Sequence, residues 1–164
     1  MSKKNEVEKL KEIMHEGMIK AFEQDGALTP VLFYHQKGEP TLTEIPPYLL
    51  NSGMGKTILT EFIRSICVEP TTLCAGLVIE AYGVKLDIDV DKEDIEKLEK
   101  GELNVSEHPK AVDIIMLILS TPEKNEMIVY EVDCENKTIG EQFTSDEAKT
   151  MGGRFAGFFN WMQN

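Results

Sequence analysis

The chain has 164 residues, of which 41% are hydrophobic and 28% are charged, and its formal net charge is -12 at pH 7. This length and composition predict one soluble domain over residues 1–164, with enough apolar side chains for its own core. A strongly acidic chain repels phosphate backbones, and no basic patch offsets the charge, so nucleic acid is not an expected partner.

Nothing in the sequence indicates a membrane or secretion. The N-terminus is charged, and the longest apolar run, Ile114–Leu119, is far shorter than the ~20 residues of a membrane-spanning helix. Three cysteines, Cys67, Cys74 and Cys134, form no CxxC pair, and their odd number excludes a closed disulfide framework. Each is expected to be a small buried side chain. These features predict a cytoplasmic protein without a membrane partner.

Residues from Glu6 to about Gln24 are predicted to form the first helix. Lys and Glu residues fill one side, and apolar residues recur at helical spacing on the other: Val7, Leu10, Met14, Met18, and Ala21 or Phe22. Asp25-Gly26 ends the helix. Such an apolar stripe favours packing on a sheet, and binding of a partner is the alternative.

A hairpin and a second helix are predicted next. Pro30–Gln36 and Pro40–Ile45 are expected to be strands joined by a short turn. Pro40 makes the second of them an edge strand, because proline cannot donate a hydrogen bond to a neighbouring strand. Apolar residues at helical spacing within Asn51–Val68 predict the middle helix, which starts near Lys56 and ends at Glu69-Pro70.

Two apolar segments, Leu73–Leu86 and Ala111–Ser120, are the predicted inner strands of the sheet. Between them, Asp91 is expected to cap a short helix that stops at Gly101. Short connections then predict an antiparallel meander of three strands: Ala111–Thr121, Glu126–Cys134 and Thr138–Phe143.

A last helix is predicted after Thr144, with one face formed by Phe155, Phe158, Phe159 and Met162. The predicted fold class is therefore α+β. It consists of a largely antiparallel sheet of five to six strands, with the N-terminal, middle and C-terminal helices covering one face. The aromatic residues of the C-terminal helix also suggest a homodimer contact, with packing on the sheet as the alternative.

Two binding motifs are incomplete. Gly55-Lys56-Thr57 resembles the end of a phosphate-binding loop, but Leu50 stands where that loop needs its first glycine. Asp87, Asp89 and Asp91 resemble the first ligands of a calcium loop, whose required glycine and glutamate are absent. No two histidines have the spacing of a metal-binding pair, so no metal and no other cofactor is expected.

Glu80 interrupts the first inner strand, and Asp113 and Glu131 interrupt two later strands. If the three carboxylates share a face, they form an acidic patch or a site with raised carboxylate pKa values. The favoured interpretation is that the sheet has one partly wet face. The turn that contains Glu107 and His108 should lie at the same end as Glu80.

Three segments resemble a group of small bacterial proteins that have no established activity. These segments are Glu80-Ala81-Tyr82, Ser106-Glu107-His108-Pro109 and Ile114–Leu119. In that group the first motif ends in tryptophan, and an arginine is expected where this chain has Ala111. The resemblance implies a strand–turn–strand unit and the fold around it, and no reaction.

The candidate site is therefore a polar cluster of Glu80, Tyr82, Glu107 and His108. The sequence leaves two functional hypotheses. The first is a non-catalytic binding or protein-interaction module, because no catalytic constellation is evident. The alternative is an enzyme of unknown reaction, with His108 or Glu80 as general acid or base.

Overall fold

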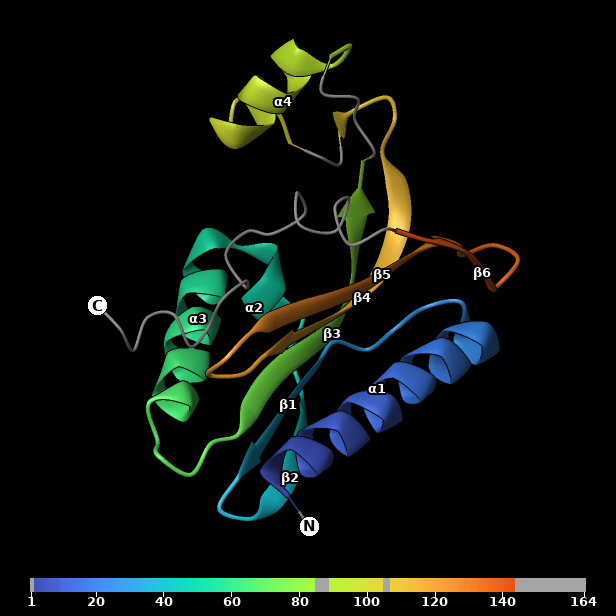
Figure 1. Cartoon of the computed structure of the whole chain (residues 1–164). Coiled ribbons are helices and arrows are strands. Elements are labelled where there is room, and N and C mark those ends of the chain that lie inside the picture. The colour runs from blue at the N-terminus through green and yellow to red at the C-terminus, as the bar shows by residue number, and fades with distance from the viewer. Residues whose placement is uncertain (1, 85–88, 105–106, 144–164) are drawn as a thin grey trace.

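The structure, a computed structural model, describes residues 2–84, 89–104 and 107–143 (Figure 1). In chain order its elements are α1 (Lys3–Asp25), β1 (Val31–Gln36), β2 (Glu39–Glu44), α2 (Tyr48–Asn51), α3 (Gly53–Cys67), β3 (Cys74–Gly83), α4 (Lys92–Glu99), β4 (Val112–Ser120), β5 (Asn125–Asp133) and β6 (Thr138–Gln142). The predicted C-terminal helix and its homodimer contact fall in residues 144–164, outside the described residues. None of the described helices is long and apolar enough to cross a bilayer.

The six strands form one antiparallel sheet in the order β2-β1-β3-β4-β5-β6. The predicted α+β class is confirmed, as are the inner position of β3 and β4 and the edge position of β2. The three predicted hairpins, β1–β2, β4–β5 and β5–β6, are all present, because strands joined by a short turn pair antiparallel. The β1–β2 turn uses Lys37 and Gly38, both with positive φ, as such turns require.

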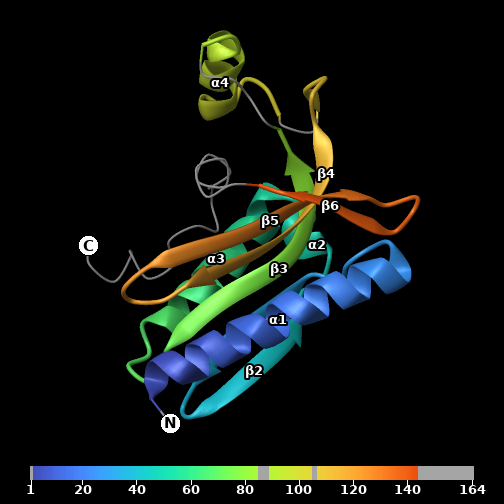
Figure 2. The same cartoon turned by 45° about the vertical axis from the view of Figure 1, so that its right-hand side comes forward.

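Helices cover both faces of the sheet, which corrects the expectation of a single covered face. In Figure 2, α1 lies in front of the sheet and α3 lies behind it. Val78 of β3 packs with α1, whereas Leu77 and Ile79 pack with α3. The reason is that β3 and β4 have apolar residues at consecutive positions, so both faces of these strands must be buried.

The helix α3 begins at Gly53, three residues before the predicted start near Lys56. The Ser52 side chain caps it by accepting a hydrogen bond from the Gly55 amide (2.9 Å). A Cβ atom at Gly55 would lie 2.6 Å from the carbonyl oxygen of Tyr48 in α2. Gly55 is thus the point where α2 and α3 pack closely, and Gly55-Lys56-Thr57 lies inside a helix.

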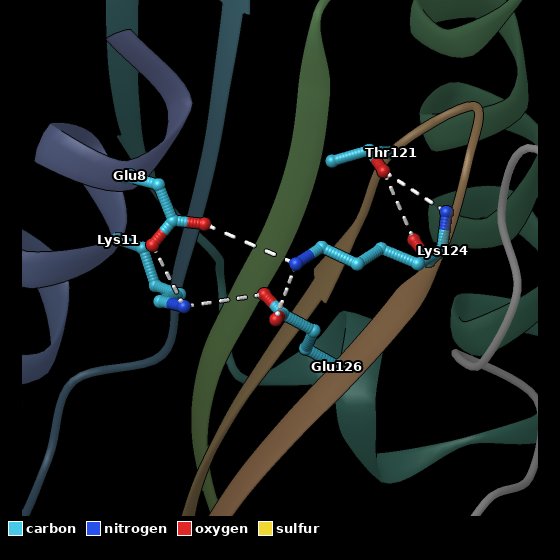
Figure 3. Close-up of polar contacts among 5 residues, drawn as sticks. All are labelled: Glu8, Lys11, Thr121, Lys124 and Glu126. Atoms are coloured by element: carbon cyan, nitrogen blue, oxygen red, sulfur yellow. Dashed lines mark hydrogen bonds and ion pairs between the residues drawn. The ribbon is translucent and has the colours of Figure 1, made fainter. Parts of the chain in front are cut away.

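Charged side chains attach α1 to the turn between β4 and β5 (Figure 3). Lys11 lies 3.0 Å from Glu8 and 3.4 Å from Glu126, and Lys124 lies 2.9 Å from Glu126. Burial opposes the charge on Glu126, but the hydrogen bond from Lys124 and the charge of Lys11 outweigh it and lower the pKa of this carboxyl. This network links α1 to the β4–β5 turn, in addition to the apolar contacts of α1 with the sheet.

The segment with α4 projects beyond the sheet, at the end where β3 stops and β4 starts (Figures 1 and 2). Asp91 occupies the N-cap position, but its side chain makes no capping bond. It accepts hydrogen bonds from Lys110 instead (3.0 and 3.1 Å). The expected capping role of Asp91 was wrong, because the ammonium of Lys110 competes for the same carboxylate.

Candidate functional site

A hollow of about 710 Å³ opens beside the end of β3 and the start of β4. Its wall is built from the start of β4, the end of β5 and the turn that follows β5. Four carboxylates line it: Asp113, Glu131, Asp133 and Glu135. None of the described residues that border it is a lysine or an arginine. The hollow is therefore a concave, negatively charged surface.

Strand pairing explains why these acids meet. Tyr82 of β3 lies opposite Asp113 of β4, and Ile114 lies opposite Glu131 of β5. Successive residues of a strand point to opposite faces, so Asp113 faces the α1 side and Glu131 the α3 side. The hollow receives both because it lies at the end of the sheet, where β4 emerges beyond the two covering helices.

The other two acids come from the turn after β5. The Asp133 carboxylate accepts hydrogen bonds from the backbone amides of Glu135 (3.0 Å) and Asn136 (3.1 Å) and from the Asn136 side chain (2.7 Å). The bonds from Asn136 lower the pKa of the Asp133 carboxyl. Asp133 thus shapes the turn and remains ionised, while Glu135 extends into solvent.

Tyr82 supplies an aromatic ring to the hollow. It is 56% exposed although most residues of its strand are apolar and buried. The face of a tyrosine ring attracts cations, and nearby carboxylates strengthen such a contact. Tyr82, one of the four predicted site residues, therefore borders this hollow.

His108 also borders the hollow, but both of its ring nitrogens are bonded within the protein. Its Nε2 lies 2.9 Å from the Asp94 carboxylate, and its Nδ1 accepts a hydrogen bond from the Lys110 amide (3.0 Å). An accepting Nδ1 carries no proton, so Nε2 is the donor to Asp94. The His108 side chain is only 4% exposed. His108 therefore joins α4 to the segment that leads into β4.

Glu80 and Glu107, the other two predicted site residues, do not line the hollow. The Glu80 carboxylate accepts a hydrogen bond from the Leu28 amide and so ties the α1–β1 connection to β3. Glu107 accepts a bond from the Asn104 side chain (3.3 Å) within its own turn. Of the four predicted residues, the hollow brings together Tyr82 and His108.

Glu80, Asp113 and Glu131 do not all share a face. Glu80 lies opposite Ile115 and belongs with Asp113 to the α1 side, whereas Glu131 belongs to the α3 side. The favoured expectation of one partly wet face was also wrong, because helices cover both faces of the sheet centre.

The cysteines differ from one another. Cys67 and Cys74 are buried as predicted, and burial raises the pKa of their thiols to about 12 and about 11. Cys134 is exposed beside the hollow, which corrects the expectation that all three are buried. Desolvation of the sulfur, together with the charges of Asp113 and Glu80, raises the pKa of the Cys134 thiol. These thiols are protonated at neutral pH and are poor nucleophiles.

The histidines lie apart in the structure. His15 Nε2, in the middle of α1, lies 2.9 Å from the Tyr130 hydroxyl, and His35 lies 3.9 Å from Glu6 in the first turn of α1. Within the described ranges, no group of three or more His, Cys, Asp or Glu side chains can hold a metal ion.

Asp133 and Glu135 were missed by the sequence analysis, and the hairpin between β4 and β5 contained the signal for their neighbourhood. Ser120 pairs with Asn125 across that turn, and counting back along both strands brings Ile114 opposite Glu131. The end of β5 and the turn after it must then lie beside the start of β4.

No protein family, curated protein or solved structure shows detectable similarity to this chain. The site is therefore interpreted from its own geometry.

Proposed function

We propose that the chain is a non-catalytic binding module that holds a positively charged segment of a partner protein in its acidic hollow. The observation that carries this proposal is the lining itself: carboxylates from β4, β5 and the following turn, with the exposed ring of Tyr82 beside them. Lysine and arginine side chains suit such a surface, because ion pairing and cation–π contacts act on the same group.

The polar contacts of His108 favour binding over catalysis. In a general base oriented by a carboxylate, one ring nitrogen binds the carboxylate and the other faces the substrate. Here the second nitrogen is bonded to the Lys110 amide. Glu80 is likewise bonded to the Leu28 amide. Both groups hold segments of the fold together.

An enzyme of unknown reaction remains the second candidate, and the observation favouring it is that Tyr82 and His108 border the same hollow. Such an enzyme must free the His108 Nδ1 from the Lys110 amide before that nitrogen can take a proton. Ligand-induced loss of protection at the Lys110 amide in hydrogen exchange would support this candidate. An amide that keeps its protection in the ligand complex would oppose it.

The binding proposal is tested with hexalysine as the probe and hexaglutamate as the opposite-charge control, by isothermal titration at physiological salt. Two double variants have the same net charge. Asp113→Asn with Glu131→Gln removes charge from the hollow, whereas Glu12→Gln with Glu16→Gln removes it from exposed positions on α1. Exposed charges farther away than the Debye length of ~8 Å are largely screened, so position matters as well as total charge.

We expect the hollow variant to weaken hexalysine binding about tenfold, equal to ~1.4 kcal/mol, and the α1 variant to weaken it less than about twofold. Tyr82→Leu should also weaken binding while leaving the charge unchanged. Equal losses in the two charge variants would show non-specific attraction to an acidic protein and would refute the proposal.

A further inference from the structure

The strand β2 is an edge of the sheet whose outer side pairs with no described strand. It pairs with β1 on one side only, and five of its six residues are exposed. In Figure 2 it lies at the margin of the sheet. Unpaired edge strands present backbone donors and acceptors that can join another strand.

Backbone contacts show which groups of β2 point outward. The Ile45 amide donates to the Pro30 carbonyl (2.8 Å), so Thr43 and Thr41, two and four residues earlier, also bond to β1. The residues between them, Leu42 and Glu44, direct their N–H and C=O groups away from the sheet.

The contacts of β1 with β3 confirm which backbone groups of β2 point outward. The His35 carbonyl accepts a bond from the Leu73 amide (2.9 Å) and therefore points toward β3. Its partner across the hairpin, Pro40, must then point outward as well. Pro40 offers a carbonyl acceptor there and has no N–H.

We propose that β2 pairs antiparallel with β2 of a second copy, around a twofold axis at Leu42. In this register the two Leu42 residues exchange two hydrogen bonds, and each Glu44 N–H donates to the Pro40 carbonyl of the other copy. Because Pro40 has no N–H, the Glu44 carbonyl opposite it has no partner in the second copy and binds water instead. The two sheets become one continuous sheet.

The side chains fit the same register. Leu42, which is 54% exposed, meets Leu42 of the second copy, and Thr41 meets Thr43, a pairing that stabilises antiparallel strands. Glu44 lies opposite Pro40, so no two like charges are directly opposed. An axis at Glu44 would oppose two carboxylates, and an axis at Pro40 would lack the central donors. Of the three residues whose backbone groups point outward, Leu42 is therefore the one at which we place the twofold axis.

The overall charge gives the contact a recognisable salt dependence. Each copy has a formal net charge of -12, so two copies repel each other at low ionic strength. Added salt screens this repulsion and leaves the backbone hydrogen bonds in place. We expect the dimer to strengthen as salt is raised, the opposite of its effect on hexalysine binding.

Sedimentation equilibrium of the full chain at increasing concentration tests the contact. The mass should rise from 18.5 kDa toward twice that value. Leu42→Lys places two like charges on the axis and should raise the dissociation constant at least about tenfold. Phe62→Lys, the same change at a half-exposed residue of α3, should leave association unchanged. Phe158→Lys tests the contact predicted for the C-terminal helix.

Amide hydrogen exchange supplies the residue-level readout. In the dimer, the Leu42 and Glu44 amides should gain protection with rising concentration, while Thr41 and Thr43 remain protected throughout. A chain that stays monomeric at the millimolar concentrations used for NMR would overturn the proposal. So would a dimer that survives Leu42→Lys, or one that Phe158→Lys dissociates while Leu42→Lys does not.

Discussion

The strands β3 and β4 have two ends that differ in what their side chains contact. At one end, residues 75–79 face residues 116–120 between α1 and α3, and nearly every side chain is buried. At the other end, Tyr82 and Asp113 lie beyond the helices and border an acidic hollow. The same pair of strands therefore stabilises the fold at the end that the helices cover and exposes carboxylates at the end that they do not cover.

The largest effect should separate the two ends of β3. Leu77 is fully buried and Tyr82 is 56% exposed. We expect Leu77→Ala to cost ~2–5 kcal/mol of unfolding free energy, because it leaves a cavity under α3. Tyr82→Ala should cost less than ~1 kcal/mol, as is usual for exposed positions. Urea unfolding measures both, and similar losses would contradict the division into two ends.

A glycine at the covered end gives the next effect. A Cβ atom at Gly76 would lie 2.3 Å from the Phe33 ring and 2.4 Å from the Ile118 carbonyl oxygen. We expect Gly76→Ala to destabilise the fold by ~1–3 kcal/mol through overpacking. Gly17→Ala in α1, where nothing lies within 4 Å, should instead stabilise it by ~0.5–1 kcal/mol. Thermal melting that shows the same sign for both changes would refute this.

The projecting segment should respond locally. Asp94→Ala removes the acceptor of His108 and should cost about 1 kcal/mol or less, because Asp94 is 40% exposed. Amides of α4 should exchange faster, while those of the β3–β4 centre should not change. Glu96→Ala, a change at an exposed residue of the same helix, is the control. Faster exchange throughout the sheet would show that α4 belongs to the main cooperative unit.

The smallest effect concerns the attachment of α1. The pKa of Glu126 is lowered in the folded state, so its charge stabilises the protein at neutral pH. That contribution is present above the ordinary glutamate pKa of ~4.3 and is lost as the pH falls through the lower folded value.

Glu126→Gln should therefore cost less than ~1 kcal/mol at pH 7, and nothing in strong acid. Urea unfolding across a pH series measures this difference. Glu123→Gln in the same turn is the control and should show no such difference. A Glu126→Gln effect that persists in strong acid would contradict the electrostatic explanation.

Much of the fold was predictable because apolar periodicity is local. The stripe of α1, the two apolar strands and the short turns each follow from neighbouring residues. The helices were wrongly predicted to cover one face of the sheet, although consecutive apolar residues in β3 and β4 indicate two covered faces. The short helix α2 was also missed, because its four residues are too few to show an apolar periodicity.

The site was predictable only in part, because its contacts are long-range. The break at Tyr82 and the turn at His108 were visible in the sequence. The bond that engages Glu80 comes from Leu28, 52 residues away, and no local pattern reveals it. The pairing of Asp91 with Lys110, 19 residues apart, is similarly invisible. Side chains that look like free acids in sequence can thus be structural in the fold.

Chemical-shift mapping tests the central claim most directly. The isotope-labelled full chain is titrated with hexalysine at physiological salt, and perturbed backbone amides are followed by two-dimensional NMR. The account predicts that shifts concentrate at Tyr82, Asp113, and residues 131–135. Shifts spread over the acidic surface of α1, or concentrated on α3, would contradict a binding role for the hollow.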